Sequence, residues 1–227
     1  MISSIGVIGG GQLGRMFALD AKRMGYHVVT LDPQEHSPCG QVADEQIVAR
    51  YEDLDAIDRL GKMTDIVTYE FENIAIESVR YLEQHGYHVT PSSEVLRITQ
   101  DRLLEKRFVR ECGVGTADFE EIANVDDIAT AAERIGFPAV IKTTRGGYDG
   151  KGQWRVTSVE QAHEAWSQAK GATLILERFV PFLCEVSVVA TRNAAGDVVT
   201  YPTVENIHDS GILSMTIVPA RVSPDIA

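Results

Sequence analysis

Residues 143–154, TTRGGYDGKGQW, place four glycines around Asp149 and Lys151, directly after an apolar run that ends in Lys142. A glycine-rich link between two antiparallel strands presents backbone N–H groups with little side-chain bulk, so it can fold over phosphate groups. A lysine held on the preceding strand can meet an α- or β-phosphate. The alternative is a hairpin tip that binds no ligand. The pattern favours a phosphate-binding flap.

A second glycine cluster, IGGGQLG at residues 8–14, forms a GxGxxG pattern through Gly9, Gly11 and Gly14. It follows an apolar strand and opens a helix, and Asp32 closes the next strand, where a dinucleotide site places its ribose-binding acid. Alone, this pattern indicates an NAD-dependent oxidoreductase. Its specificity is low, because a tight strand-to-helix turn needs glycine whether or not a phosphate lies there.

Two glutamates further along the chain suit the rest of a nucleotide. The segment LILERFVP, residues 174–181, carries a strand into Glu177 and an apolar pair. A purine edge requires an acceptor for its exocyclic amine and an N–H donor for its ring nitrogen. Glu185 follows on the next strand, where a carboxylate suits two ribose hydroxyls. The alternative for each is a surface glutamate.

The elements that must position these residues fall into two patterns. Apolar runs at 4–9, 27–32, 46–49, 65–70 and 87–91 alternate with helical periodicity at 12–25, 53–62 and 73–85. Such alternation predicts a parallel sheet with helices on both faces. We expect this first domain to end near residue 97.

The second pattern begins with a helix at 98–113, for which Gly113 is the stop signal. Strands expected at 117–122, 137–144, 153–157 and 173–179, with helices at 125–135 and 158–169, form an α+β unit with antiparallel strands around the glycine loop. Strands at 184–192 and 198–206 follow, joined by a turn at 193–197.

Composition excludes several classes of function. The chain of 227 residues is 44% hydrophobic and 24% charged, which is typical of a soluble globular protein. Its net charge of −12 repels nucleic acid and anionic lipid, so we expect neither as a partner. No signal peptide or membrane span is indicated, and we expect a cytoplasmic protein. The three cysteines suggest neither zinc nor a disulfide, and Cys184 reads as a core residue.

Together, the motifs GGGQLGRM, TYEFENI, QDRLLEK, VIKTTRGGYDGKGQ, ERFVPFLCEVSV and VENIHDSGIL resemble the ATP-grasp ligases of purine synthesis. The resemblance is strongest to the family of N5-carboxyaminoimidazole ribonucleotide synthetases and runs over essentially the whole chain. It implies an α/β fold: a Rossmann-like pre-ATP-grasp domain at 1–97, then an ATP-grasp domain at 98–227. In the latter, a lid subdomain spans 115–180 and a C-terminal subdomain begins at 181.

The resemblance also implies a reaction. ATP phosphorylates bicarbonate to carboxyphosphate, which carboxylates the amine of 5-aminoimidazole ribonucleotide and releases ADP and phosphate. A homodimer is expected. Three alternatives stay open: another ATP-grasp ligase of the biotin carboxylase-like or formate-using type, an NAD-dependent oxidoreductase, and a non-catalytic nucleotide-binding module.

Residue roles follow from the matching motifs. The resemblance assigns the phosphates to Arg102 and Lys142, the flap to Gly147, Tyr148, Asp149, Gly150, Lys151, Gly152 and Gln153, the adenine to Glu177, Arg178, Phe179 and Val180, the ribose to Glu185, and the nucleotide's edge to His208. Catalysis is assigned to Tyr148, Asp149 and Lys151, and contact with the aminoimidazole ribonucleotide to Gln12 and Glu72. Asp32 then becomes a strand-end residue of the LDP turn.

Magnesium is implied as a second cofactor, beside ATP. Members of the family continue well beyond residue 227, and that later part carries the magnesium ligands and further basic residues. We therefore propose no metal ligand in this chain. We expect an ATP-grasp domain that is incomplete at its C-terminal end and shows weak or no ATPase activity by itself.

Overall fold

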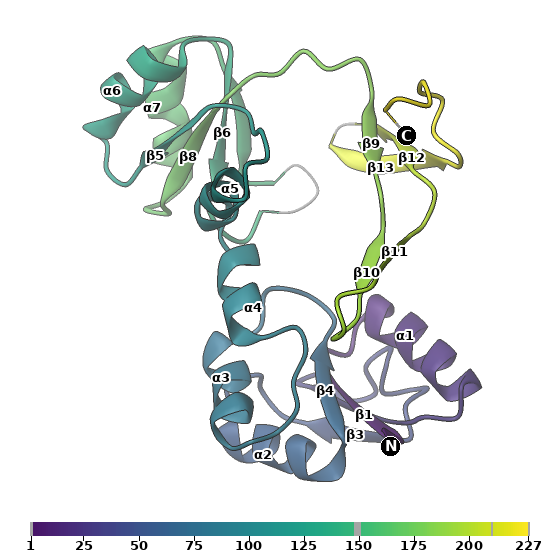
Figure 1. The fold of residues 1–227 in the computed structure, drawn as a ribbon. Helices are drawn as coiled ribbons and strands as arrows, with labels where there is room; N and C mark the ends of the chain where they lie inside the picture. The colour runs from purple at the N-terminus through teal and green to yellow at the C-terminus, as the bar shows by residue number, and fades with distance from the viewer. Residues whose placement is uncertain (1, 148–150, 210, 227) are drawn as a thin grey trace. The chain divides into compact units, whose positions relative to one another are not determined.

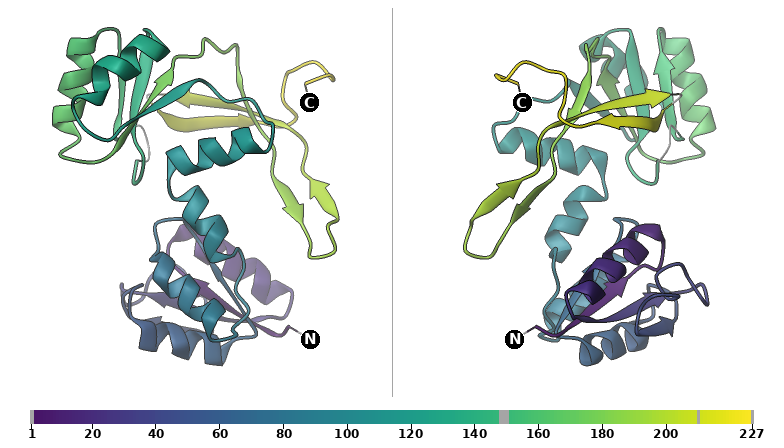
Figure 2. Two further views of the ribbon diagram at one scale, coloured as in Figure 1. Left: turned by 60° about the vertical axis from the view of Figure 1, so that its left-hand side comes forward. Right: turned by 90° about the vertical axis from the view of Figure 1, so that its right-hand side faces the viewer.

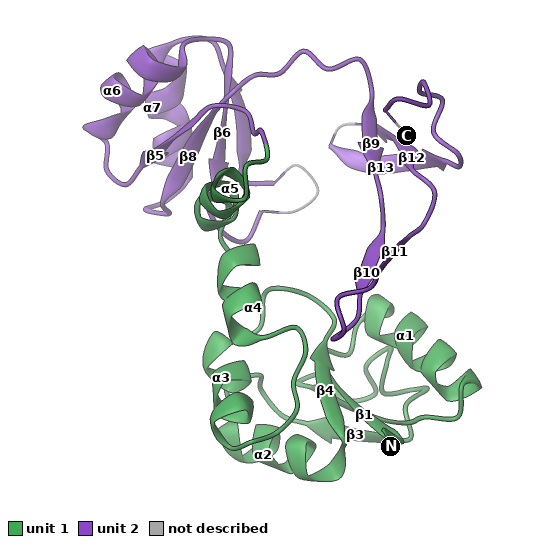
Figure 3. Cartoon of the chain, viewed as in Figure 1, with its two compact units in different colours: residues 1–114 green, residues 115–227 purple. Residues whose placement is uncertain are grey.

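The computed structural model describes residues 2–147, 151–209 and 211–226. Figure 1 shows the ribbon, and Figure 3 shows its two compact units, residues 1–114 (unit 1) and residues 115–227 (unit 2). The domain boundary expected near residue 97 lies before the boundary between these two units, and it remains a prediction. Within the described ranges, none of the helices combines the length and the apolar character that a bilayer span requires.

Unit 1 contains a parallel sheet, as its strand–helix alternation predicts. The strands lie in the order β3-β2-β1-β4, and all three pairings are parallel. The strands are β1 (Ser4–Ile8), β2 (His27–Asp32), β3 (Glu45–Val48) and β4 (Ile66–Tyr69), and the helices are α1 (Gln12–Arg23), α2 (Leu54–Met63), α3 (Ile76–Gln84), α4 (Ser93–Thr99) and α5 (Arg102–Glu111). The carboxyl ends of β1, β2 and β4 therefore meet at one edge.

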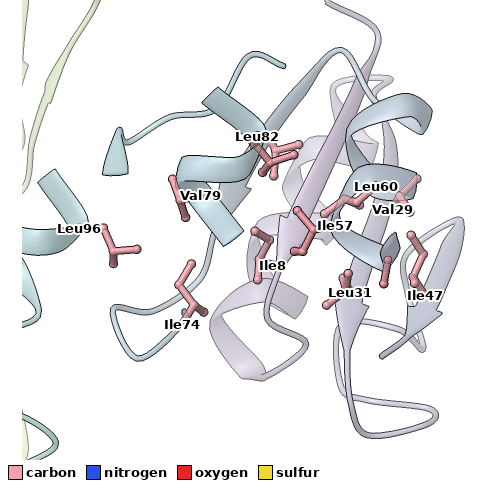
Figure 4. Packing of buried hydrophobic residues seen from close by; sticks show 12 residues of the cluster. Ile8, Val29, Leu31, Ile47, Ile57, Leu60, Ile74, Val79, Leu82 and Leu96 are labelled. Carbon is pink, nitrogen blue, oxygen red and sulfur yellow. The ribbon is translucent and has the colours of Figure 1, made fainter. Parts of the chain in front are cut away.

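Two apolar cores cover the two faces of this sheet, because successive side chains of a strand point to opposite faces. Val7 and Val28 pack with Ala18 and Ala21 of α1. The opposite face forms a larger core with α2 and α3, shown in Figure 4. Its buried residues include Ile8, Val29, Leu31, Ile57, Leu60, Val79 and Leu82. Unit 1 is thus a three-layer α/β structure.

The single helix predicted at 98–113 is wrong, because the structure has two helices in this region. Helix α4 ends at Thr99, and α5 starts at Arg102. Between them Asp101 is extended, and its Oδ1 accepts hydrogen bonds from the backbone of Leu103 (3.0 Å) and Leu104 (3.3 Å). An aspartate that caps a new helix in this way starts it afresh, which helical periodicity alone does not reveal.

The strand expected at 87–91 is also not formed. This segment makes an isolated parallel bridge between Val89 and Val67, with backbone bonds from Val67 N to His88 O and from Thr90 N to Val67 O. Pro91 follows directly and has no N–H to continue a ladder.

Unit 2 begins with an antiparallel sheet in the order β5-β8-β6-β7. Its elements are β5 (Phe119–Ile122), α6 (Asp127–Ile135), β6 (Ala139–Thr143), β7 (Gln153–Val156), α7 (Val159–Gln168) and β8 (Leu174–Arg178). Both helices lie on the same side of the sheet in Figure 2, and they share one core with it. The predicted antiparallel strands before and after the glycine loop are β6 and β7, which confirms that part of the pattern.

The rest of unit 2 is a set of short strands: β9 (Glu185–Ser187), β10 (Ala190–Arg192), β11 (Val198–Thr200), β12 (Val204–Asp209) and β13 (Ile212–Ile217). The predicted turn at 193–197 does join a hairpin, β10–β11. Each predicted long strand, however, is divided into two strands in different sheets, β13-β12-β9 and β10-β11. Pro202, which cannot donate to a ladder, lies at one of these breaks.

Cys184 is exposed, so the expectation of a core residue is wrong. It lies just before β9, an edge strand of the three-stranded sheet, and its neighbour Leu183 is also exposed. The apolar character of FVPFLCEV is therefore not a sign of burial here.

Candidate functional site

A cavity of about 450 Å³ in unit 2 collects most of the predicted nucleotide-binding residues. Ligand pockets for small molecules have volumes of roughly 300–1,000 Å³. The predicted residues in its wall are Lys142, Gln153, Glu177, Arg178, Phe179, Val180, Glu185 and His208, and the others are Ala117, Val140, Phe182 and Gly211. They come from β6, β7, β8, β9 and β12 and the segments beside them.

An ion pair in the cavity wall links β6 to β8. Lys142 Nζ lies 2.9 Å from Oε2 of Glu177. In the antiparallel register Val140 pairs with Glu177, so Lys142 stands two residues further along β6 and on the same face. The side chain of Glu177 is 8% exposed and that of Lys142 26% exposed. The ammonium group is therefore held at the edge of the cavity by a buried carboxylate.

A second pair of polar side chains in the cavity wall, joined by a hydrogen bond, repeats this diagonal arrangement. Glu185 of β9 pairs in register with Asn206 of β12, and His208 lies two residues beyond Asn206. His208 Nδ1 lies 2.8 Å from Glu185 Oε2. Because a carboxylate accepts several hydrogen bonds, the pair leaves Glu185 able to accept more from a ligand's hydroxyl groups.

The end of β8 is fixed by contacts within unit 2. Arg178 N donates to Asp118 O at 2.8 Å, and Phe179 N donates to Pro138 O at 3.2 Å. Both N–H groups already donate within the protein, so we do not assign either of them as the donor to a purine edge. The guanidinium carbon of Arg155 lies 4.2 Å from the centroid of the Phe179 ring, which is a cation–π contact.

Arg155 is a residue that the sequence reasoning missed. It lies two positions after Gln153 on β7, and Gln153 lines the cavity. Because residues i and i+2 of a strand share a face, the alternation of QWRV was a signal that Arg155 belongs beside the site.

The flap is described only at its two ends. Thr143 N donates to Gly152 O at 2.9 Å, and Lys142 pairs with Gln153, so the base of the hairpin is closed beside the cavity. Lys151 is exposed and Gly147 is half-buried. The predicted catalytic residues Tyr148 and Asp149, together with Gly150, lie outside the described residues.

In unit 1, carboxylates of the protein itself occupy the glycine turn. Gly10 N donates to Asp32 Oδ2 at 2.8 Å, and Glu70 Oε2 accepts from Gly11 N at 2.7 Å and from Gly14 N at 3.1 Å. Burial raises the pKa of Glu70, while these two N–H groups lower it and Asp32 raises it further.

Asp32 is buried, and three donors engage it. Besides Gly10 N, it accepts from Tyr51 Oη at 2.6 Å and from Gln34 N at 2.8 Å. Such a carboxylate serves the turn itself, which argues against the ribose-binding role required by the NAD alternative. The other interpretation of Asp32, as a strand-end residue of the LDP turn, fits this geometry.

The predicted substrate residues of unit 1 lie in two places. Gln12 is the exposed first residue of α1, and Glu72 is exposed in the segment after β4. Gln100 was missed: its Nε2 donates to the carbonyl oxygens of Glu72 and Ile74, both at 2.7 Å, and so braces that segment. Its place just before Asp101 in the QDRLLEK motif was the available signal.

Arg102 is half-buried at the start of α5, in unit 1. Its assignment to the phosphates remains a prediction. Across the described ranges, no three His, Cys, Asp or Glu side chains form a group that would hold a metal ion.

Family models match both parts of the chain. The ATP-grasp domain model matches residues 107–227, and the ribonucleotide synthetase preATP-grasp domain model matches residues 2–100. A curated relative, the N5-carboxyaminoimidazole ribonucleotide synthase of Bacillus subtilis, is 46% identical over 222 residues, which are 98% of this chain and 58% of that protein.

Solved structures with the same arrangement are similar to this one. The ADP complex of an N5-carboxyaminoimidazole ribonucleotide synthetase is 46% identical with a TM-score of 0.94, covering 99% of this chain and 59% of that one. An Aspergillus clavatus N5-carboxyaminoimidazole synthase, in complex with ADP and 5-aminoimidazole ribonucleotide, is 28% identical with a TM-score of 0.89, covering 99% and 59%. The chain thus spans a little under three fifths of the length of these relatives.

Proposed function

Because the chain belongs to the ATP-grasp family, whose domain model matches residues 107–227, we propose that its protein is an ATP-dependent ligase that carboxylates 5-aminoimidazole ribonucleotide. The observation that carries this proposal is the cavity of unit 2, which gathers Lys142, Glu177, Glu185 and His208 around a space of nucleotide size. The similarity to N5-carboxyaminoimidazole ribonucleotide synthases, which extends through both units, supports the choice of substrate.

The proposed reaction has two steps. An oxygen of bicarbonate attacks the γ-phosphorus of ATP, the bond to the β-phosphate oxygen breaks, and carboxyphosphate and ADP form. The amine nitrogen of the ribonucleotide then attacks the carboxyl carbon of carboxyphosphate, and the bond between that carbon and the phosphate oxygen breaks. The amine loses a proton, and the products are a carbamate and inorganic phosphate. Carboxyphosphate reacts with water, so the site must exclude water while it exists.

Residues of the cavity have distinct roles in this proposal. Lys142 binds the phosphates, as a fixed ammonium whose position Glu177 holds. The end of β8, residues 177–180, faces the adenine, Glu185 accepts from the ribose hydroxyls, and His208 borders the nucleotide. Gly147 to Gln153 close over the phosphates, as a flap that excludes water. Within it Tyr148, Asp149 and Lys151 act at the acceptor amine, with Asp149 orienting it or removing its proton.

Unit 1 binds the second substrate in this proposal. Gln12, at the start of α1, and Glu72, after β4, contact the aminoimidazole ribonucleotide, and Arg102 reaches the phosphates of ATP. The geometry of the glycine turn disfavours the NAD-dependent alternative, because the N–H groups that would bind a pyrophosphate donate to Glu70 instead.

Several finer features belong to the same proposal. Magnesium accompanies ATP in this proposal, and we assign it no ligand and no step in this chain. The protein acts in the cytoplasm as a homodimer and binds neither nucleic acid nor membrane. The net charge of −12 supports the last point.

The test measures release of ADP and phosphate by the protein that contains this chain. We expect release to require ATP, bicarbonate and 5-aminoimidazole ribonucleotide together. Replacing the last by glycinamide ribonucleotide plus formate should abolish it, which separates this ligase from a formate-using relative. Turnover that ignores aminoimidazole ribonucleotide, or enhanced NADH fluorescence on mixing with no response to ATP, would refute the proposal.

A further inference from the structure

The turn after β1 lies between two acidic residues because of the strand order. β1 has β2 and β4 as its parallel neighbours, and their carboxyl ends lead to Asp32 and Glu70. The turn is continuous with the sheet, since Gly9 N donates to Leu31 O at 2.9 Å and Glu70 N donates to Ile8 O at 3.0 Å. Both carboxylates are therefore set by the sheet and not by a surface loop.

Glycine occupies positions 9, 11 and 14 of this turn for two different reasons. Gly9 has φ +110°, a conformation that side chains disfavour. Gly11 has φ −78° and ψ −159°, which any residue adopts. A Cβ on Gly11 would overlap Oε1 of Glu70, and a Cβ on Gly14 would overlap Oε2. A side chain on either glycine would thus displace the Glu70 carboxylate from its place in the turn, and one on Gly14 would also lie 3.1 Å from the backbone oxygen of Gly9.

In a dinucleotide site the corresponding glycines admit a pyrophosphate, whose oxygens accept from the same backbone N–H groups. Here Glu70 makes both hydrogen bonds from within the fold, and Gly10 N is taken by Asp32. Any phosphate that approached would meet occupied donors and two carboxylates.

We propose that Glu70 is a positioning residue for the second substrate: it fixes the Gly11–Gly14 turn as an internal anion, keeps phosphate groups out of it, and sets the direction of Gln12. The last point rests on the proposed function, since Gln12 lies between the two glycines that Glu70 binds. The turn then offers the substrate an amide side chain and a negative field, which suit the aminoimidazole ring and its amine and reject a phosphate.

The first test uses the wild-type chain of 227 residues, with inorganic pyrophosphate as the probe and backbone amide NMR as the readout. We expect the amide signals of Gly11 and Gly14 to stay unshifted at probe concentrations that shift amides around Lys142. Saturable shifts at Gly11 and Gly14 would overturn the inference, and would do so even if carboxylation of aminoimidazole ribonucleotide were intact.

A second test asks whether Glu70 is what requires the glycine. Gly11→Ala should reduce hydrogen-exchange protection of the strand amides of β1 and β2, and adding Glu70→Ala should restore part of that protection. If the losses of protection in the two single variants simply added in the double variant, Gly11 would be glycine for a reason other than Glu70.

The positioning role is read from kinetics of the protein that contains this chain. Glu70→Gln keeps an acceptor oxygen but loses the charge. We expect the KM for aminoimidazole ribonucleotide to rise by about 10-fold while the KM for ATP stays the same. Weaker hydrogen bonds from Gly11 N and Gly14 N would leave Gln12 poorly oriented, and one hydrogen bond to a charged group is worth roughly that factor. Glu77→Gln, an exposed glutamate on α3, is the matched control. An unchanged KM for the ribonucleotide in Glu70→Gln, or equal increases in both KM values, would count against positioning.

Discussion

Nζ of Lys142 and Oε2 of Glu177 lie 2.9 Å apart although 35 residues separate them in sequence. The pairing arises because β8 lies beside β6 in the sheet, with β7 on the other edge of β6. A buried carboxylate thus holds a half-buried ammonium at the wall of the cavity. The ion pair restrains the lysine side chain, so less conformational entropy is lost when a nucleotide binds to it.

Replacing this lysine should weaken nucleotide binding. Lys142→Gln retains an amide that can donate to Glu177, so unit 2 should stay folded. We expect the Kd for ADP, measured by isothermal titration calorimetry, to rise by about 10- to 100-fold, because a hydrogen bond to a charged group contributes about 1.5–3 kcal/mol.

Lys62→Gln provides the control for that experiment. Lys62 is an exposed lysine of α2 in unit 1, paired with Asp58. We expect its Kd for ADP to equal that of the wild type. If Lys142→Gln also bound ADP within about twofold of the wild type, Lys142 would not contact the phosphates.

Each unit has its own core, and this should be visible in unfolding. The only two tryptophans, Trp154 and Trp166, lie in unit 2 and pack against its core. Leu176 is fully buried there, so Leu176→Ala should lower the free energy of unfolding of unit 2 by about 2–5 kcal/mol. The shift is measured as the urea midpoint of tryptophan fluorescence.

Leu60→Ala is the matched change in unit 1, where Leu60 of α2 is fully buried in the core beside the sheet. It should reduce protection of the β1 amides from hydrogen exchange and leave the tryptophan transition in place. A tryptophan midpoint that moved equally in both variants would mean that the two cores unfold as one.

The layered part of the fold was predictable because its signals are local. Apolar runs such as HVVTLD and the helical periodicity at 12–25 predict strands and helices from a few neighbouring residues. The apolar stripe behind that helix prediction, Leu13, Met16, Phe17 and Met24, is exposed, and Ala18 and Ala21 are the residues that α1 buries. The division between α4 and α5 was not predictable in this way. Asp101 does not interrupt the helical pattern in the sequence, but in the structure its carboxylate caps the following helix. Pro202 similarly lies between β11 and β12, which the alternation of the sequence alone predicts as one strand at 198–206.

The site was predicted from its resemblance to a family more than from spacing. Nothing in the sequence positions of Lys142 and Glu177 indicates that β8 adopts a place next to β6. Glu70 was missed for a related reason: the glycine pattern was interpreted as a place for an external anion, and Glu70 is 59 residues from Gly11. Only the strand order shows that the protein supplies this anion itself.

Asp65 gives unit 1 a pH dependence. Its Oδ2 accepts hydrogen bonds from the backbone N–H and the hydroxyl of both Ser3 and Ser4. These bonds, of which that from Ser3 N has the largest effect, lower the pKa of Asp65 from 3.8 to about 2. A depressed pKa contributes stability that is present above the ordinary value of 3.8 and lost as the pH falls toward about 2. The free energy of unfolding of unit 1, measured from the protection of the β1 amides against hydrogen exchange, should therefore differ between wild type and Asp65→Asn above pH 3.8, and the difference should shrink across that window. A difference that persisted at the acid end would exclude this cause.

The last prediction separates a structural Asp32 from a ligand-binding one. Tyr51→Phe removes the hydroxyl that donates to Asp32 Oδ2 at 2.6 Å, and should cost about 1 kcal/mol of unfolding free energy. Asp32→Ala removes the acceptor of Gly10 N, Gln34 N and Tyr51 Oη together, and should cost about 3 kcal/mol or more. In the Asp32→Ala background, Tyr51→Phe should cost almost nothing further, because the two residues share one interaction. If Asp32→Ala instead left the protection of the β1 amides against hydrogen exchange unchanged while altering the binding of a dinucleotide, the carboxylate would belong to a ligand site and not to the turn.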